Sequence, residues 1–356
     1  MLRTEDSVCL RHSALKAPFP YFGGKARVAP VVWQALGTVE NYVEPFFGSG
    51  AVLLARPQVE GLETVNDKCG FISNFWRAVQ HDPAAVAHYA DYPVLENCLH
   101  ARHAWLVGQA QALVARLEGD PDYYDAKSAG WWVWGMALWI GSGFCSGDGP
   151  WQVQEGRLVR AEANGSGIHR QRVHLGHAGK GVKRQRVHLG HGGQGVQRLA
   201  VHEPPGGPAG TGAQGLLAWM QALAERLRRV RVCCGDWTRV LGPTPTVHQG
   251  LTGVFLDPPY PHRERDRTLY RVEEDVAAAV TAWAVAHGDD PRLRIVLCGY
   301  TDTGAMPATW RAVPWTAPGG YGLLGNGRGR TNAGRECLWL SPHCLAAASS
   351  AQLALF

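Results

Sequence analysis

The sequence lacks the features of a membrane-embedded or exported chain. Its 356 residues contain no apolar run that approaches the roughly 20 residues of a membrane-spanning helix. The N-terminal segment MLRTEDSVCLRHSA has no apolar stretch typical of a secretory signal. We therefore expect a cytoplasmic protein that has no membrane partner.

Cysteine patterns typical of metal sites are also missing. The nine cysteines are scattered between Cys9 and Cys344, and none forms a CxxC pair. Four histidines lie between residues 174 and 191, but no cysteine or carboxylate is interleaved with them. We expect no bound metal. Because disulfides are rare in the cytosol, we also expect reduced thiols in the core.

Two glycine-rich nucleotide-binding patterns are absent. No GxxxxGK[ST] occurs in the chain, which disfavours a site for a nucleoside triphosphate. In the loop FFGSG (46–50), Leu53 stands where the dinucleotide fingerprint has its third glycine, so a nicotinamide oxidoreductase is disfavoured. A glycine turn still lets a ligand approach the backbone closely, and this one suits a nucleoside without a phosphate chain.

Basic charge is concentrated in one glycine-rich segment. Residues 157–201 hold nine of the 35 Lys and Arg but only one of the 30 Asp and Glu. The same segment contains RQRVHLGH at 170–177 and again at 184–191, a period too short and too rarely repeated for a solenoid. So uneven a charge favours a polyanionic partner over a plain solvated loop.

Short apolar runs alternate with helical patterns on both sides of this segment. The strand-like runs are 62–67, 229–234, 253–256, 293–298 and 336–341, besides the one that ends at Glu44. Helical spacing occurs near 28–36, 71–79, 216–228 and 272–287. This alternation predicts an α/β fold, with a parallel sheet and helices on both faces.

The middle of the chain interrupts this alternation and reads as an insertion. Residues 82–125 have a polar helical pattern, and the tryptophan-rich run 129–140 predicts a buried helix. We therefore expect an α/β domain formed by 17–81 and 216–344, an insert at 82–215, and tails at 1–16 and 345–356.

Acidic residues stand at the ends of three strand-like runs, namely Glu44, Asp67 and Asp257. Ligands bind at the carboxyl ends of the strands in an open parallel sheet. Asp67 ends the strand that follows the glycine loop, and an acid at that place can accept hydrogen bonds from both ribose hydroxyls.

The strongest motif is Asp257-Pro258-Pro259-Tyr260. Two consecutive prolines cannot continue a strand ladder, and they hold the backbone extended and stiff. A planar base can stack on Tyr260 while Asp257 and the Pro258 carbonyl accept the two N–H groups of its exocyclic amine. The alternative is a structural turn with an N-capping acid.

Four segments together resemble the ordered motifs of the Dam-like DNA adenine methylase family. They are PYFGGK (20–25), YVEPFFGSG (42–50), VNDK (65–68) and FLDPPY (255–260). The resemblance covers about 17–80 and 229–300. It implies a Rossmann-like methyltransferase sheet, with residues 82–215 as an inserted target-recognition region. It also implies methyl transfer from S-adenosylmethionine to the exocyclic N6 of adenine in DNA.

The resemblance also assigns the site residues. Tyr21 and Lys25 contact the methionine end of the cofactor, Asp67 holds its ribose, and Asp236 lies near its adenine. The cofactor set is Tyr21, Phe22, Lys25, Glu44, Phe46, Gly48, Gly50, Asp67 and Asp236. The catalytic set around the target base is Asp257, Pro258, Pro259 and Tyr260. Pro20 and Tyr21 stand where several relatives carry a second lysine or a tryptophan.

Such an enzyme must flip its target out of double-stranded DNA, because a duplex hides the amine. We expect the basic segment to bind the DNA, since Arg suits phosphates and guanine edges. Its candidate residues are Arg170, Arg172, Lys183, Arg184 and Arg186. N4-cytosine methylation, RNA adenine methylation and an inactive nucleic-acid-binding protein remain alternatives, and a restriction endonuclease partner remains open.

Overall fold

The computed structural model describes residues 15–19, 21, 25–57, 60–93, 95–139, 144–145, 213–259, 276–301, 306–315 and 335–345. For 151–154, 157–160 and 213–214 it describes the backbone alone. Phe22, Tyr260, the RQRVHLGH repeat and the five basic candidate residues lie outside this part of the chain.

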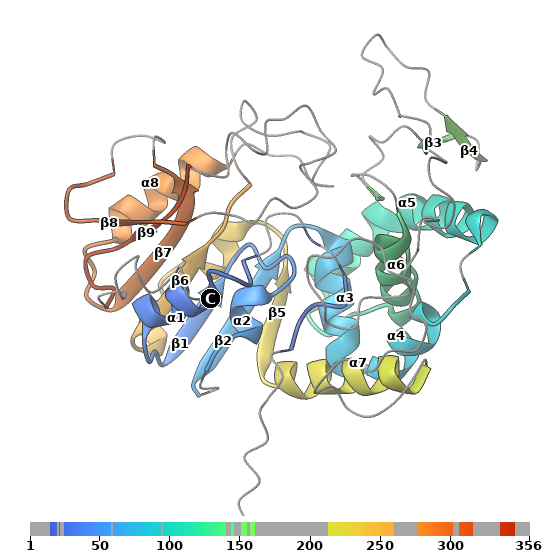
Figure 1. The fold of residues 1–356 in the computed structure, drawn as a ribbon, viewed down its shortest axis with the longest axis horizontal. Coiled ribbons are helices and arrows are strands. Elements are labelled where there is room, and N and C mark those ends of the chain that lie inside the picture. The colour runs from blue at the N-terminus through green and yellow to red at the C-terminus, as the bar shows by residue number, and fades with distance from the viewer. Residues whose placement is uncertain are drawn as a thin grey trace, which may run out of the picture.

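The core of the molecule is a seven-stranded sheet in the order β5-β2-β1-β6-β7-β9-β8 (Figure 1). The first five strands in this order are parallel, whereas β9 is antiparallel to both of its neighbours. Their bounds are β1 (Asn41–Glu44), β2 (Leu62–Asp67), β5 (Val230–Cys234), β6 (Thr252–Leu256), β7 (Leu293–Tyr300), β8 (Arg311–Pro314) and β9 (Glu336–Leu340). The predicted α/β class is confirmed, with an antiparallel edge added.

The strand order reverses at the middle of the sheet. The chain runs from β1 outward to β2 and β5, and then returns to place β6 on the other side of β1. Open α/β sheets bind their ligands outside the carboxyl ends of the strands at such a reversal. A ligand site is therefore expected beyond the carboxyl ends of β1 and β6.

Helices cover both faces of the sheet, as expected. One apolar cluster joins α1 and α3 to alternate side chains of the strands, and a second joins α8 and the 3-10 helix η1 to the opposite face. The helices among the described residues are α1 (Ala29–Leu36), α2 (Ala51–Leu54), α3 (Gly70–His81), α4 (Pro83–Ala90), α5 (Glu96–Gly119), α6 (Ala126–Leu138), α7 (Ala213–Leu227) and α8 (Ala277–His287), with η1 (Trp237–Val240) and η2 (Val247–Gln249). None of them is long and apolar enough to cross a membrane.

The helices of the predicted insert lie beyond the β5 edge of the sheet (Figure 1). α6 packs against α3 and α4, and its Trp132 and Trp134 are buried, so the tryptophan-rich run is a buried helix as predicted. A two-stranded antiparallel ladder, β3 (Trp151–Gln154) with β4 (Arg157–Arg160), follows these helices. The domain boundary itself stays a prediction, since α7 also packs against α3 and α4.

One guanidinium connects the insert helices to the sheet. Arg77 on α3 is buried, and its Nε donates to the carbonyl of Val232 on β5 at 2.8 Å. Its Nη1 donates to the carbonyls of Leu117, Asp120 and Tyr123 in and after α5. Because these hydrogen bonds satisfy most of the buried donors, the charge is tolerated without a carboxylate partner.

Some features had no sequence signal. β8 is a four-residue edge strand that ends in Pro314, and nothing in its sequence distinguished it from a loop. The described part of the helix expected at 272–287 begins at Ala277, and residues 260–275 lie outside the described residues. The eight cysteines in the described part of the chain are free thiols.

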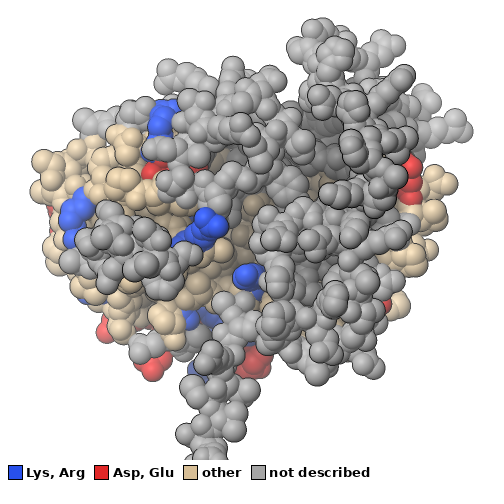
Figure 2. Space-filling view, in the orientation of Figure 1, with Lys and Arg blue, Asp and Glu red and all other residues tan. Residues whose placement is uncertain are grey.

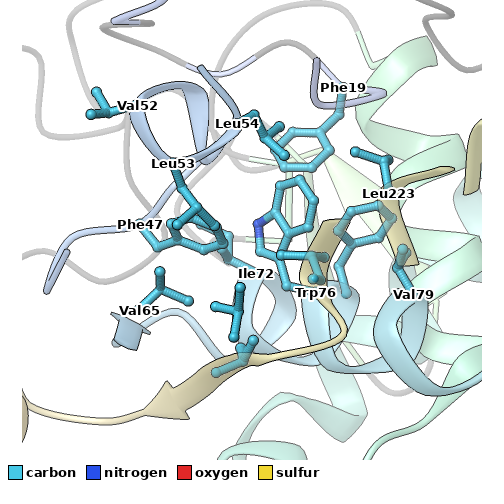
Figure 3. Close-up of a cluster of buried hydrophobic side chains, with 14 of the residues drawn as sticks. Phe19, Phe47, Val52, Leu53, Leu54, Val65, Ile72, Trp76, Val79 and Leu223 are labelled. Carbon is cyan, nitrogen blue, oxygen red and sulfur yellow. The ribbon is translucent and has the colours of Figure 1, made fainter. Parts of the chain in front are cut away.

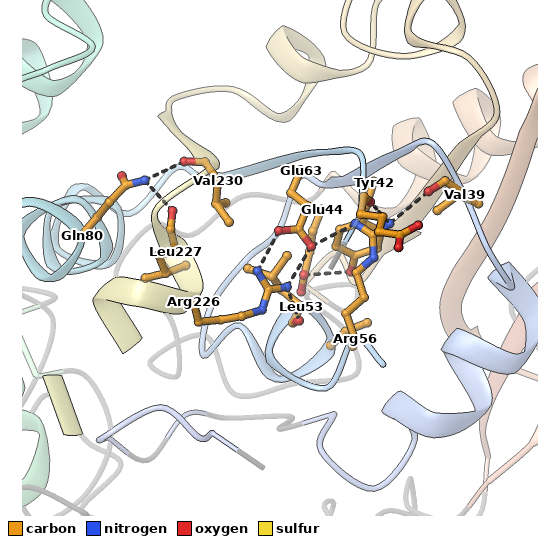
Figure 4. A network of polar contacts seen from close by, with 12 residues as sticks. Val39, Tyr42, Glu44, Leu53, Arg56, Glu63, Gln80, Arg226, Leu227 and Val230 are labelled. Carbon is orange, nitrogen blue, oxygen red and sulfur yellow. Dashed lines mark hydrogen bonds and ion pairs between the residues drawn. The ribbon is translucent and has the colours of Figure 1, made fainter. Parts of the chain in front are cut away.

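A buried ion triad holds α7 and α2 to β2 (Figure 4). Both oxygens of Glu63 accept from Arg226 at 2.7 and 2.8 Å, and Oε1 also accepts from Arg56 at 3.0 Å. Arg226 further donates to the carbonyl of Leu53, and Arg56 to that of Val39. The three charged side chains are less than a tenth exposed, so each depends on its partners.

We predict that Glu63→Gln destabilises the fold by about 3–5 kcal/mol, because it leaves two buried guanidinium groups without their anion. Urea unfolding of the purified protein measures the change. The matched control is Glu225→Gln, which removes an exposed ion pair with Arg228 and should cost less than about 1 kcal/mol. Equal losses for the two variants would contradict the role of the triad.

Candidate functional site

The loop after β1 has the left-handed turns that its glycines predict. Gly48 has φ +49° and Gly50 has φ +63°, a conformation that L side chains rarely adopt. A Cβ on Gly48 would lie 2.5 Å from Cε1 of Tyr21, so the tyrosine ring packs directly on the loop. The carbonyl of Gly48 accepts from the indole of Trp76 at 2.9 Å, and Figure 3 shows that indole in the apolar cluster beneath the loop.

Asp67 joins this loop to the end of β2. One carboxylate oxygen accepts from the backbone N–H of Gly48 at 2.9 Å, and the other accepts from that of Cys69 at 2.8 Å. The side chain is half-buried. Because each carboxylate oxygen has two lone pairs, Asp67 can accept further hydrogen bonds from a ligand.

Asn66, which lies in the VNDK segment but had no assigned role, joins three loops. Its Nδ2 donates to the carbonyls of Pro45 after β1 and Gly235 after β5, at 3.1 and 3.0 Å. Its Oδ1 is buried and has no hydrogen-bond partner in the described part of the chain. The ends of β1, β2 and β5 are thereby held together around an unused acceptor.

Aromatic rings lie at the same edge of the sheet. Asp236 caps η1 by accepting from the backbone N–H of Thr238 at 3.0 Å. The next residue, Trp237, stacks on Phe46 with ring centroids 6.3 Å apart and planes 27° apart. Phe46 and Asp236 were expected near the site, whereas Trp237 was not.

Glu44 is buried under the loop. The hydroxyl of Tyr42 donates to its Oε2 at 2.9 Å, and the backbone of Leu53 provides another hydrogen bond. Burial raises the pKa of Glu44 well above its usual range, so the protonated form is favoured. This side chain supports the loop from within the core, and its predicted part in cofactor binding stays a prediction.

Lys25 and Asp257 form an ion pair at the carboxyl end of β6. The ammonium lies 2.9 Å from Oδ2 of Asp257, and the lysine is 5% exposed. Burial is the largest single influence and lowers the pKa of Lys25. The charges of Asp257, Cys298 and Glu336 and the hydrogen bond to Asp257 together outweigh it and raise that pKa above its usual value, so the lysine stays charged. The carbonyl of Lys25 accepts from Val28 and Ala29, which fixes the residue at the start of α1.

Three further side chains surround this pair. The Cys298 thiol is buried beside Asp257, and burial together with that carboxylate raises its pKa. Glu336 is half-buried, and burial raises its pKa although Lys25 opposes the shift. The ring centroid of Trp315 lies 5.8 Å from the ammonium of Lys25. None was a candidate, because their strands are remote in sequence from both motifs.

The structure thus gathers most of the candidate residues at one edge of the sheet. β1 pairs with both β2 and β6. The loop of Gly48, the carboxylate of Asp67 and the Lys25–Asp257 pair therefore lie at the ends of three adjacent strands. Lys25 and Asp257, which the resemblance assigned to different ligands, contact each other. Pro258 is buried and Pro259 half-buried after them. No cluster of His, Cys, Asp or Glu fit to hold a metal occurs within the described ranges.

One family model matches the chain. Residues 21–103 match the model of the D12 class N6 adenine-specific DNA methyltransferases. The match includes Lys25, the glycine loop, Asp67 and α3, and it ends long before Asp257. No curated protein matches the chain.

The matched family and the seven-stranded sheet agree with each other. A mixed sheet with helices on both faces and a strand-order reversal is consistent with a Rossmann-like methyltransferase fold. The resemblance to adenine methylases is thereby confirmed, and DNA is the substrate that the family implies. Residues 21–103, less than a quarter of the chain, are thus similar to the D12 class of N6 adenine-specific DNA methyltransferases.

Proposed function

We propose that this enzyme transfers the methyl group of S-adenosylmethionine to the N6 of an adenine flipped out of double-stranded DNA. The observation that carries the proposal is the position of the Lys25–Asp257 pair. Asp257 directly precedes Pro258 and Pro259 and directly follows β6. That strand pairs with β1, after which the glycine loop begins. An amine that binds at Asp257 would therefore lie close to a nucleoside that binds at Asp67.

The loops beyond β1, β2 and β5 fit a nucleoside. Asp67 would accept from the ribose hydroxyls, and the buried Oδ1 of Asn66 is an acceptor without a partner among the described residues. Trp237 and Asp236 would contact the adenine ring at the end of β5. When bound, S-adenosylmethionine supplies a methyl group on a positively charged sulfur. Tyr21, Phe22 and Lys25 would lie toward its methionine end.

The acceptors after β6 suit an exocyclic amine. The lone pair of the adenine amine is delocalised into the ring, so it is a poor nucleophile. Hydrogen bonds to Asp257 and to the Pro258 carbonyl would favour a pyramidal nitrogen and stabilise the positive charge that develops on it. The cofactor would supply the methyl group to this nitrogen and would leave as an uncharged thioether. The nitrogen then releases one proton, for which Asp257 is the nearest acceptor in this proposal.

Lys25 would orient the carboxylate for this task. Its hydrogen bond to Oδ2 would hold the Asp257 carboxylate in place for the amine. Pro258 and Pro259 would keep the backbone carbonyl in place, and Tyr260 would stack on the flipped base. Because the methyl group is already activated, positioning would supply most of the rate enhancement.

DNA contacts are proposed for the basic segment, which lies outside the described residues. On the face shown in Figure 2, the described Lys and Arg side chains are scattered and do not gather into one broad patch. The concentrated charge of residues 157–201 remains the best candidate for the phosphate contacts. A restriction partner has no supporting observation among the described residues.

We predict that the purified protein, incubated with unmethylated duplex DNA and S-adenosylmethionine, forms N6-methyladenine. Nucleoside digestion and mass spectrometry identify the product. Asp257→Ala should lower the rate by at least about a hundredfold, because it removes an acceptor from the amine. The affinity of this variant for the cofactor, measured by calorimetry, should stay within a few-fold of wild type.

The other products decide between the alternatives. N4-methylcytosine would contradict adenine as the target base, but it would still agree with the role of the acceptors after β6. Methylation of RNA but not of DNA would overturn the substrate. An Asp257→Ala variant as active as wild type would remove the role given to that carboxylate, and no product from cofactor-bound protein would contradict the proposal.

We further predict that Gly48→Ala weakens cofactor binding by about tenfold or more. The new methyl group would force an unfavourable φ and would push Tyr21 away from the loop. The control is Gly108→Ala on α5, where the added methyl group meets nothing within 4 Å and should stabilise the helix by about 1 kcal/mol. Calorimetric titration with S-adenosylmethionine compares the two. Equal affinities would contradict a cofactor site at this loop.

A further inference from the structure

β9 carries a second carboxylate to the face of the sheet on which the Lys25–Asp257 pair lies. Glu336 begins β9 and pairs with Tyr300 at the end of β7, and Cys298 stands two residues earlier on β7. Alternate residues of a strand point to the same face, and directly opposed residues share a face. Glu336 and Cys298 therefore lie on one face, where the Cys298 thiol is beside Asp257.

Trp315 connects Glu336 to the lysine. Its backbone N–H donates to the carbonyl of Glu336 at 3.0 Å, and its ring lies over the ammonium of Lys25. Lys25 precedes α1, which packs on β6 and β7 on this same face. One tryptophan thus contacts both residues.

The three charges influence one another. The charge of Glu336 raises the pKa of Lys25, and the charges of Lys25 and Asp257 act on Glu336 in opposite directions. The titratable groups that face Glu336 from β7 are Cys298 and Tyr300. Arg335, which precedes it, places its guanidinium over the ring of Tyr300 at 4.7 Å from the centroid.

A single carboxylate on a buried lysine would be poorly suited to the proposed chemistry. Lys25 alone would neutralise Asp257, and a neutralised carboxylate stabilises a developing positive charge only weakly. A second carboxylate that acts on the same ammonium would leave an excess of negative charge at the site. That excess would favour the amine in its transition state over the uncharged amine that first binds.

We propose that Glu336 is a positioning residue that shares Lys25 with Asp257 and so preserves the negative charge that Asp257 presents to the target amine. This inference rests on the proposed function. Glu336 itself touches neither the base nor the cofactor in this scheme, and it acts through the lysine.

A pH dependence follows with a definite sign. Burial raises the pKa of Glu336, so its carboxyl becomes neutral at a higher pH than an ordinary glutamate would. The wild-type rate should therefore fall on the acid side above the usual glutamate range. The raised pKa also means that ionised Glu336 destabilises the fold at high pH, so Glu336→Gln should be at least as stable as wild type there.

The test compares wild type, Glu336→Gln, Glu336→Asp and the exposed control Glu225→Gln as full-length proteins. Glu336→Gln should lower kcat for adenine methylation by about tenfold, less than the loss expected for a group that contacts the amine. KM for DNA should change less than about twofold, since no DNA contact is removed. Glu336→Asp should restore part of kcat, and Glu225→Gln should match wild type.

The pH–rate profile separates charge from packing. In Glu336→Gln the acid limb that wild type shows should be lost, and the midpoint of thermal unfolding should not fall. A wild-type kcat in Glu336→Gln would overturn the inference. A loss of kcat that merely parallels a loss of stability would overturn it too.

A titration that needs no substrate distinguishes this inference from the proposed function. Carbon-13 NMR of labelled glutamate follows the carboxyl of Glu336, which Glu336→Gln identifies by its disappearance. Lys25→Met should raise the pKa of Glu336 and Asp257→Asn should lower it, because each removes one of its charged neighbours. If neither variant shifts that pKa, the three side chains are not coupled, whether or not wild type forms methyladenine.

Discussion

The parallel pairing of β1 with both β2 and β6 is the constraint on which the site depends. Because these strands start at the same edge, the loops that follow them converge at the opposite edge, where the strand order reverses. Asn66 and Asp67 then tie the converging loops by hydrogen bonds to Pro45, Gly235 and Gly48. The nucleoside pocket that we propose is therefore a consequence of strand order, with Asn66 and Asp67 supplied by the end of β2 and Asp236 by the loop after β5.

Two clusters of buried charge in this protein differ in their balance. Glu63 meets two arginines near the start of β2, so this triad has an excess of positive charge and ties helices to the sheet. At the other edge, Lys25 pairs with Asp257 and is influenced by the charge of Glu336, so that cluster would have an excess of negative charge when both carboxyls are ionised. A positive excess cannot assist an amine that gains positive charge, whereas a negative one can. The sign of the excess separates a structural cluster from a catalytic candidate.

Local patterns predicted what depends on local sequence. The bounds of β2, the buried helix α6 and the acids at the strand ends follow from hydrophobic spacing and from residues next to one another in the chain. Relations between remote segments had no such signal: Lys25 pairs with Asp257, and Glu336 on the antiparallel strand β9 lies opposite Tyr300 at the end of β7. Asn66 lies in the VNDK segment and Trp237 directly follows Asp236, but neither residue had an assigned role, because their partners Pro45, Gly235 and Phe46 come from other loops.

The most direct measurement is a crystal structure of the protein with S-adenosylhomocysteine, the product that retains the nucleoside. We expect both ribose hydroxyls to donate to Asp67, with the adenine ring beside Trp237 and the amino-acid end directed toward Tyr21. The sulfur should then lie between the glycine loop and Asp257. A nucleoside bound elsewhere, or one that leaves Asp67 without a ligand contact, would contradict a cofactor site at the reversal of the sheet.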